Sequence, residues 1–247
     1  MSTESFRPLP NTPPSSFSGK TRFYGRMLLD LQVWTVYREL RRHLPTYRGD
    51  VLDVGCGQSP YRFLLDKQAT GYTGIDIFDA EKFDYDNPEI VAFDGEHIPF
   101  PDESFDAVIC TEVLEHASNY QQLVDEIHRV MKVGAEAIVT VPWSARFHYI
   151  PYDFFRYTPS SLSTMFAGFA TSTITPRGTD ISVIGSKLAI LWFRNAFPAQ
   201  GRKYVWAPLW LLASPLFLFV VAVAHICTWF GVGSSDDPLG YTIVVTK

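Results

Sequence analysis

Apolar residues in the central part of the chain alternate between strand-like runs and helix-like repeats. Short apolar runs predict strands at residues 51–54, 72–77, 90–93, 105–110 and 137–141. Between them, helices are predicted near 59–66 and at 119–132; in the second, apolar positions share one face and Gly134 lies just beyond its end. Strands alternating with helices are typical of βαβ units, so the fold class is α/β with a mostly parallel sheet.

The flanking segments add elements at both ends of this pattern. Apolar positions from Arg26 to Leu44 have helical spacing, whereas residues 1–20 are rich in Ser, Thr and Pro and predict a loose arm. After the fifth strand, residues 159–166 predict a short helix and 171–175 a sixth strand. A long apolar stretch then interrupts the pattern until a β-branched run at 241–246.

Charge and cysteine content narrow the class of protein. The formal net charge of −5 gives no basic surface, so we expect no nucleic acid partner. Cys56, Cys110 and Cys227 are scattered without metal-ligand spacing, which favours a reducing compartment over a disulfide framework.

The strongest motif is a glycine-rich turn that follows the first predicted strand. Asp53-x-Gly55-x-Gly57 ends an apolar run, and the two glycines let the backbone turn tightly and approach a ligand. Asp76 ends the next apolar run, about 20 residues later. A nucleotide-binding fold has at this spacing a carboxylate that accepts hydrogen bonds from the ribose hydroxyls. A dinucleotide site requires a third glycine, which is missing here, so a nicotinamide-dependent oxidoreductase is not expected.

Four motifs in order make the chain resemble the class I S-adenosylmethionine (SAM) dependent methyltransferases of the type 11-like group. They are Asp53 to Gly57, Asp76, the segment 93–99 and the segment 105–116. The resemblance implies SAM as cofactor and a Rossmann-like, mostly parallel sheet of seven strands with the last one antiparallel. It also implies that Asp94 accepts a hydrogen bond from the adenine amino group. The implied cofactor-binding residues are Asp53, Gly55, Cys56, Gly57, Asp76, Ile77, Asp94, Gly95, Thr111 and Glu112.

Two histidines are candidate catalytic bases. The aromatic loop after the fifth strand carries His148 and Asp153, and His116 ends the fourth motif. An imidazole titrates near working pH, so His148 is the first candidate, His116 the competing one and Asp153 a third polar group that can act on an acceptor. The alternative is that these residues only order the loop. In-line methyl transfer depends largely on orientation and does not always need a strong base.

Glu112, Glu115 and His116 form a further pattern, Glu-x-x-Glu-His. It is similar to the metal-binding set of small-RNA 2′-O-methyltransferases, and positions three or four apart on a helical turn share one face. In that case Asp153 or His148 supplies another ligand. The same pattern is widespread in related methyltransferases with no known metal, where Glu115 and His116 order the loop over the cofactor. We expect no metal, with this set as the alternative.

The resemblance divides the chain into three parts. Residues 1–48 are an N-terminal arm and helix, residues 49–178 with 239–247 form the SAM-binding domain, and residues 179–238 are a helical insertion between the sixth and seventh strands. From Tyr204 to Phe230 there is no charged residue, and a helix of that length crosses a bilayer core of about 30 Å. A crossing separates the seventh strand from its sheet, and Pro208 and Pro215 break the segment.

A helical hairpin that dips into one leaflet therefore fits best. The alternatives are a helical pair that covers a dimer face and a true span. The expected protein is a peripheral or monotopic methyltransferase on the cytoplasmic side of a membrane. We expect it to O-methylate a lipid-linked glycan or another lipophilic acceptor. A soluble small-molecule methyltransferase, with the insertion as lid or homodimer interface, is the first alternative. A non-catalytic SAM-binding scaffold is the second.

Overall fold

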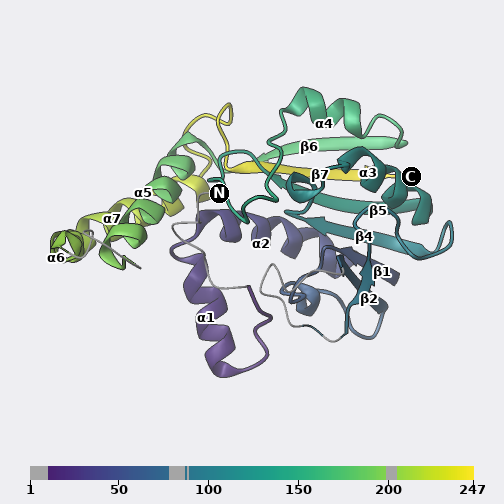
Figure 1. Cartoon of the computed structure of the whole chain (residues 1–247), viewed down its shortest axis with the longest axis horizontal. Coiled ribbons are helices and arrows are strands. Elements are labelled where there is room, and N and C mark those ends of the chain that lie inside the picture. Colours follow the sequence, from purple (N-terminus) through teal and green to yellow (C-terminus); the bar gives the residue numbers. More distant parts are fainter. Residues whose placement is uncertain (1–10, 78–86, 88, 199–204) are drawn as a thin grey trace.

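One mostly parallel sheet organises the molecule, whose computed structural model describes residues 11–77, 87, 89–198 and 205–247. The strands are β1 (Gly49–Val54), β2 (Thr70–Ile77), β3 (Val91–Phe93), β4 (Phe105–Thr111), β5 (Met131–Pro142), β6 (Thr171–Arg177) and β7 (Gly240–Thr246). Their order is β3-β2-β1-β4-β5-β7-β6, and β7 runs antiparallel to the other six described strands (Figure 1). The predicted Rossmann-like seven-stranded fold is confirmed.

Helices cover both faces of this sheet. They are α1 (Phe17–Met27), α2 (Leu31–His43), α3 (Tyr120–Val130), α4 (Pro159–Met165), α5 (Asp180–Ala196), α6 (Ala207–Leu212) and α7 (Ser214–Trp229), with short 3-10 turns η1 (Leu44–Thr46), η2 (Arg62–Leu64) and η4 (Leu114–His116). Successive strand residues point to opposite faces. Leu52 therefore packs in the core under α3 and α4, and Val51 packs under α1 and α2.

The N-terminal prediction needs two corrections. The expected single helix from Arg26 to Leu44 is two helices, because the Asp30 carboxylate accepts a hydrogen bond from the Val33 N–H at 3.2 Å and starts α2 afresh. Within the residues predicted as a loose arm, α1 begins at Phe17, where the Ser16 hydroxyl oxygen caps the Gly19 N–H at 3.0 Å. Residues 1–10 lie outside the described part of the chain.

Two central helices are shorter than predicted. In place of a helix near 59–66 there is only η2, because Ser59 has a left-handed φ of 50° and Leu65 is extended. Helix α3 ends at Val130, since Met131 is extended and already begins β5. Gly134 lies inside β5 with φ of 82°, and its N–H donates to the Lys247 carbonyl at 2.9 Å.

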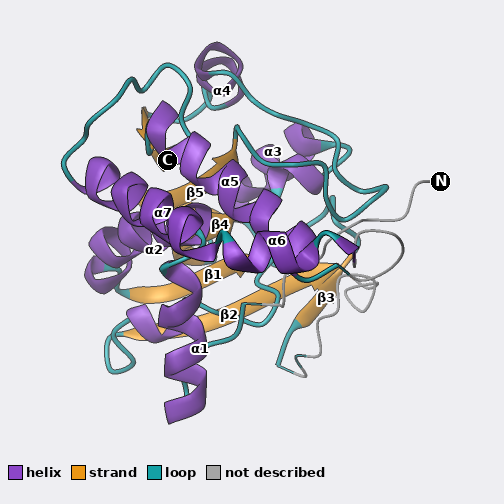
Figure 2. Ribbon diagram, turned by 90° about the vertical axis from the view of Figure 1, so that its left-hand side faces the viewer, coloured by secondary structure: helices purple, strands orange, loops and turns teal. Residues whose placement is uncertain are grey.

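Residues between β6 and β7 form α5, α6 and α7, which extend away from the sheet (Figure 1). Helices α2, α5 and α7 lie side by side (Figure 2). Gly185 of α5 allows the close approach, because a Cβ there would lie 2.5 Å from Ala224 Cβ of α7. The long apolar segment is divided at Ala213, with Pro215 in the first turn of α7. No described helix has both the length and the apolar character to cross a bilayer.

Candidate functional site

The glycine turn lies at the carboxyl end of β1 and is joined to the end of β2. Gly55 has φ of 65°, and a Cβ there would lie 2.4 Å from the Val113 side chain, so only glycine fits. The Gly57 N–H donates to Asp76 Oδ2 at 2.8 Å, and the Ile77 N–H donates to Asp76 Oδ1 at 2.8 Å. Each carboxylate oxygen keeps a second lone pair, which suits ribose hydroxyls. The residues present therefore fit a nucleoside at this edge.

Asp53 lies beneath this turn as a buried acid. The Tyr72 hydroxyl donates to Asp53 Oδ2 at 2.7 Å and lies 2.9 Å from Ser59 Oγ. Burial raises the pKa of Asp53 to about 7, although the Tyr72 hydrogen bond opposes this; the nearby Asp76 carboxylate raises it further. A cation bound above the turn will favour the ionised form of Asp53.

Asp94 follows β3 and is engaged with its own loop. Its Oδ1 accepts the N–H groups of Glu96 at 2.8 Å and His97 at 2.6 Å, and its Oδ2 lies 3.0 Å from His97 Nδ1. The His97 backbone hydrogen bond is the main cause that lowers the pKa of Asp94 to about 2. Gly95 follows with φ of 87°. The adenine contact stays a prediction, since residues 78–86, which precede β3, lie outside the described ranges.

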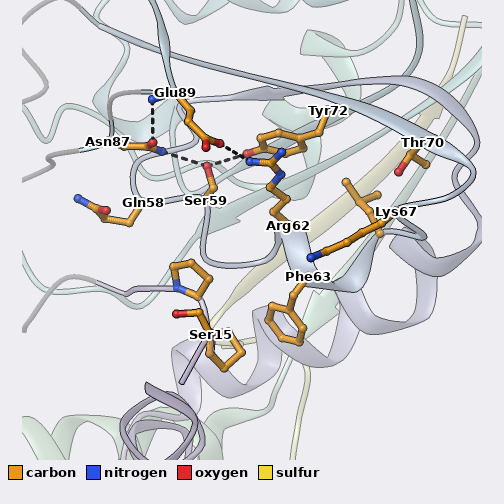
Figure 3. A pocket seen from close by; sticks show the side chains of 13 residues that line it. Ser15, Gln58, Ser59, Arg62, Phe63, Lys67, Thr70, Tyr72, Asn87 and Glu89 are labelled. Carbon is orange, nitrogen blue, oxygen red and sulfur yellow. Dashed lines mark hydrogen bonds and ion pairs between the residues drawn. The ribbon is translucent and has the colours of Figure 1, made fainter. Parts of the chain in front are cut away.

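A cavity of about 750 Å³ opens beside the glycine turn (Figure 3). The Arg62 guanidinium lies over the Tyr72 ring at 4.5 Å and pairs with Glu89 at 2.5 Å, while the Asn87 amide donates to Ser59 Oγ at 3.2 Å. Asp76 and Asp94 do not line this cavity. It therefore lies to one side of the predicted ribose and adenine positions.

A second cleft, of about 610 Å³, lies between α1, α2, the loop after β5 and α5. We name it the α5 cleft. Its polar lining includes Arg26, Gln32, Glu112 and His148. Its apolar lining includes Ala189, Ile190 and Phe193 of α5. Glu112 immediately follows Thr111 at the carboxyl end of β4, so the cleft adjoins the strand ends where the cofactor residues are predicted.

A buried guanidinium fixes Glu112 in this cleft. Arg177 of β6 is fully buried and donates to Glu112 Oε1 at 2.6 Å, Thr35 Oγ1 at 3.2 Å and the Val141 carbonyl at 3.1 Å. The Gln32 amide donates to Glu112 Oε2 at 2.9 Å. Sequence reasoning missed Arg177 and Gln32, because only the folded sheet brings β6, β4 and α2 together.

His148 and Asp153 form a tight pair at the cleft. His148 Nδ1 lies 3.0 Å from Asp153 Oδ2, and the His148 N–H donates to the same oxygen at 3.0 Å. Arg156 donates to both oxygens of Asp153, at 2.5 and 2.8 Å. Burial alone would raise the pKa of Asp153, but the hydrogen bonds from Arg156 and His148 hold it well below its usual range. Asp153 is thus an anion that orients His148 rather than a free base.

His116 lies against His148, with ring centroids 4.9 Å apart. Its Nδ1 is 2.6 Å from the Tyr152 carbonyl oxygen, and burial followed by the nearby His148 lowers its pKa to about 4. Of the alternative metal set, Glu112 does not converge with the other two residues. Residues 114–116 form a 3-10 turn rather than an α-helix, and Glu112 is bound by Arg177 and Gln32. Glu115 and His116 lie close to His148, which is one of the two residues predicted to supply another ligand.

Comparisons with known proteins match the central part of the chain to a known type of domain. Residues 52–139 match the family model described as a methyltransferase domain. The chain contains a class I SAM-dependent methyltransferase domain. The cofactor of this domain is SAM, and the matched range covers the glycine turn, Asp76, Asp94 and Glu112.

Similar proteins match the chain over part of their length. An uncharacterized protein of Methanocaldococcus jannaschii is 31% identical over 122 residues, which cover 48% of this chain and 53% of that protein. A sterol 24-C-methyltransferase of Gibberella zeae is 38% identical over 95 residues, 34% of this chain and 25% of that protein. The chain thus spans about half the length of the first relative and a quarter of the second.

A solved structure shares the fold more completely. A SAM-dependent methyltransferase from Archaeoglobus fulgidus superposes with a TM-score of 0.53 at 18% identity, covering 86% of this chain and 93% of that one. At this identity the likeness concerns the fold alone. The matched range therefore contains the strand ends where the cofactor residues are predicted. The α5 cleft is formed by segments outside that range together with Glu112.

Proposed function

We propose that the protein transfers the SAM methyl group to a hydroxyl of a lipophilic acceptor, either a lipid-linked glycan or a small lipophilic molecule, at a membrane surface. One observation carries the proposal: α5 lines the cleft beside Glu112 and His148 and also packs along α7. The same helix thus connects the acceptor cleft to an apolar surface. The sterol named in one relative is likewise a lipophilic acceptor.

That apolar surface is formed by α6, α7 and the residues next to them. Leu212, Phe219 and Trp229 are 79%, 66% and 72% exposed. We call the following exposed residues the hairpin surface: Val205, Trp206, Leu209, Leu211, Leu212, Leu216, Leu218, Phe219, Val223, Ile226, Trp229, Phe230 and Val232. An apolar patch of this size marks an interaction site, and indole rings favour the boundary between water and lipid. A helical hairpin inserted into one leaflet gives these residues an apolar environment.

The reaction we propose is an in-line displacement. The acceptor oxygen attacks the methyl carbon, the carbon–sulfur bond breaks with its electron pair going to sulfur, and the hydroxyl proton leaves the acceptor. His148 and His116 are the proposed groups that activate this hydroxyl, and Asp153 orients His148. The proposal puts the protein on the cytoplasmic side of the membrane, where free thiols such as Cys56, Cys110 and Cys227 persist.

The proposal is tested with the purified chain in two steps. Calorimetry measures SAM binding, and we expect Asp76→Asn to weaken it about tenfold or more, because a charge-assisted hydrogen bond to ribose is weakened. The chain is then incubated with SAM and lipid extract, and mass spectrometry is used to find a lipid heavier by one methylene group. Undetectable SAM binding by the wild type would contradict the proposal.

Flotation with phosphatidylcholine and phosphatidylglycerol vesicles tests the membrane part. We expect the wild type to float and the double variant Leu212→Glu, Phe219→Glu to stay in the dense fraction, since each apolar side chain contributes about 1.5–3 kcal/mol when buried. The control is Val133→Glu in β5, where Val133 is 78% exposed and is not part of the hairpin surface. A wild type that remains dense and runs as a homodimer would support the interface alternative instead.

A further inference from the structure

Glu115 is a buried carboxylate beside His116 and His148. Its side chain is fully buried, and neither Oε1 nor Oε2 has a hydrogen-bond partner among the described residues. The His116 Nε2 atom lies 3.6 Å from Glu115 Oε1, beyond hydrogen-bond distance. Burial raises the pKa of Glu115 well above its usual range, and the nearby Glu112 carboxylate adds to this. A buried carboxylate is costly unless a proton or a cation neutralises it.

Two imidazole rings lie beside this carboxylate, and a hydrogen bond at Nδ1 fixes the orientation of each. His116 Nδ1 faces the Tyr152 carbonyl at 2.6 Å, and His148 Nδ1 faces Asp153 Oδ2 at 3.0 Å and the Arg146 carbonyl at 2.9 Å. Carbonyl and carboxylate oxygens only accept hydrogen bonds, so this network assigns the proton of each neutral ring to Nδ1 and the lone pair to Nε2. Metal-ligating histidines commonly have such a carbonyl or carboxylate behind the ring.

We propose that Glu115, His116 and His148 bind one divalent first-row metal ion of the Zn²⁺ and Co²⁺ class. One carboxylate oxygen and one nitrogen of each ring lie within 4.8 Å of one another. Ligands about 2.1 Å from a tetrahedral ion are about 3.4 Å apart, so small side-chain movements complete the set. Two imidazoles and one carboxylate suit Zn²⁺ or Co²⁺, whereas Mg²⁺ and Ca²⁺ prefer oxygen ligands alone.

The neighbouring charges are compatible with a cation here. Glu112 is neutralised by Arg177, and the Arg156 guanidinium is paired with Asp153, behind the His148 ring. His148 lines the α5 cleft, so an open fourth position of the ion faces the acceptor. This role rests on the proposed function and changes how the two histidines activate the hydroxyl: they hold the ion, a hydroxyl bound to the ion loses its proton to solvent water more readily, and the resulting oxygen attacks the methyl carbon.

Metal binding is measured on the untagged full chain with no SAM or acceptor present. Calorimetry with ZnCl₂ and the visible absorption of added CoCl₂ are expected to show one ion per chain, and MgCl₂ no binding. We expect Glu115→Gln and His148→Ala each to weaken Zn²⁺ binding about a hundredfold or more, since even outer residues of such sites change affinity 10–100-fold.

The matched controls come from a second histidine–carboxylate pair on the surface. His43 Nδ1 lies 3.5 Å from Glu136 Oε1, with both side chains partly exposed. His43→Ala and Glu136→Gln should leave Zn²⁺ binding unchanged. The inference is overturned if the wild type binds no stoichiometric ion, or if Glu115→Gln binds as the wild type does.

SAM calorimetry on the same variants separates this inference from the proposed function. Glu115→Gln should bind SAM like the wild type, which also shows that it folds. SAM binding without Zn²⁺ binding overturns the metal site alone. Zn²⁺ binding without SAM binding overturns the proposed function and leaves the metal site standing.

Discussion

At the scale of single residues, Asp53 couples the cofactor turn to pH. Its pKa in the folded chain is about 7, above the ordinary value of 3.8, because it is buried. Between these two values the folded state keeps a proton that the unfolded chain has lost. The contribution of Asp53 to stability is therefore greatest below about pH 4 and is lost as pH rises through about 7.

We expect Asp53→Asn to remove this dependence. Urea unfolding of wild type and variant between pH 5 and 8 should give a stability difference that moves in favour of the variant as pH rises. Asp106→Asn is the control, because hydrogen bonding to Lys132 lowers the pKa of Asp106, and its contribution is lost only as pH falls through that lowered value. The difference in free energy of unfolding between the wild type and Asp106→Asn should not change from pH 5 to 8. If the difference between the wild type and Asp53→Asn is also independent of pH, the prediction is wrong.

Loss of the Arg177 side chain should destabilise the fold strongly. Its guanidinium is fully buried against Glu112, so Arg177→Met leaves a carboxylate without its counter-charge and should lower the free energy of unfolding by about 3 kcal/mol. Adding Glu112→Gln should recover part of that loss in urea titrations. Arg42→Met, at a 62% exposed side chain paired with Glu39, should cost less than about 1 kcal/mol. If the changes in free energy of unfolding caused by Arg177→Met and Glu112→Gln simply add in the double variant, the two side chains are not coupled and the prediction is wrong.

Sequence spacing predicted the residues at the glycine turn but not the residues that surround Glu112. Asp53 and Asp76 stand in adjacent parallel strands and Gly57 lies in the turn after the first of them, so their order in the chain anticipates that they lie together at one edge. Arg177 and Gln32 reach Glu112 from distant segments, and nothing in their own neighbourhoods indicates it.

At the scale of elements, the apolar runs predicted the strands because parallel strands are buried on both faces. The helices were less predictable, since short side-chain bonds decide where they begin. Asp30 divides the N-terminal helix, and the left-handed backbone of Ser59 prevents the expected helix after β1. Hydrophobic periodicity alone does not predict these local hydrogen bonds and backbone conformations.

The contact between α5 and α7 depends on one glycine. Gly185→Ala places a Cβ 2.5 Å from that of Ala224, so the two helices must separate, and we expect thermal stability to fall. Combining it with Ala224→Gly should restore part of the loss. Gly168→Ala is the control, because its Cβ meets no atom within 4 Å. An unchanged melting temperature in Gly185→Ala would show that the helices are not packed this closely.

At the scale of the whole molecule, the hairpin surface and the α5 cleft should act together on one acceptor. We expect the double variant Leu212→Glu, Phe219→Glu to lose most methyl transfer to acceptors embedded in vesicles, about tenfold or more, while transfer to the same acceptor in detergent micelles changes little. Methyl incorporation from labelled SAM measures both. Equal losses in vesicles and micelles would assign the hairpin a role in catalysis or folding instead of docking.

The placement of β7 has a consequence for how the chain is made. This strand lies between β5 and β6 and is the one neighbour of β6 among the described strands, yet α5, α6 and α7 are synthesised before it. On the ribosome, the apolar helices therefore emerge while β6 has no partner and β5 still has one open edge. Contact of the nascent helices with lipid at that stage would let the last strand close the sheet on a chain already held at the bilayer.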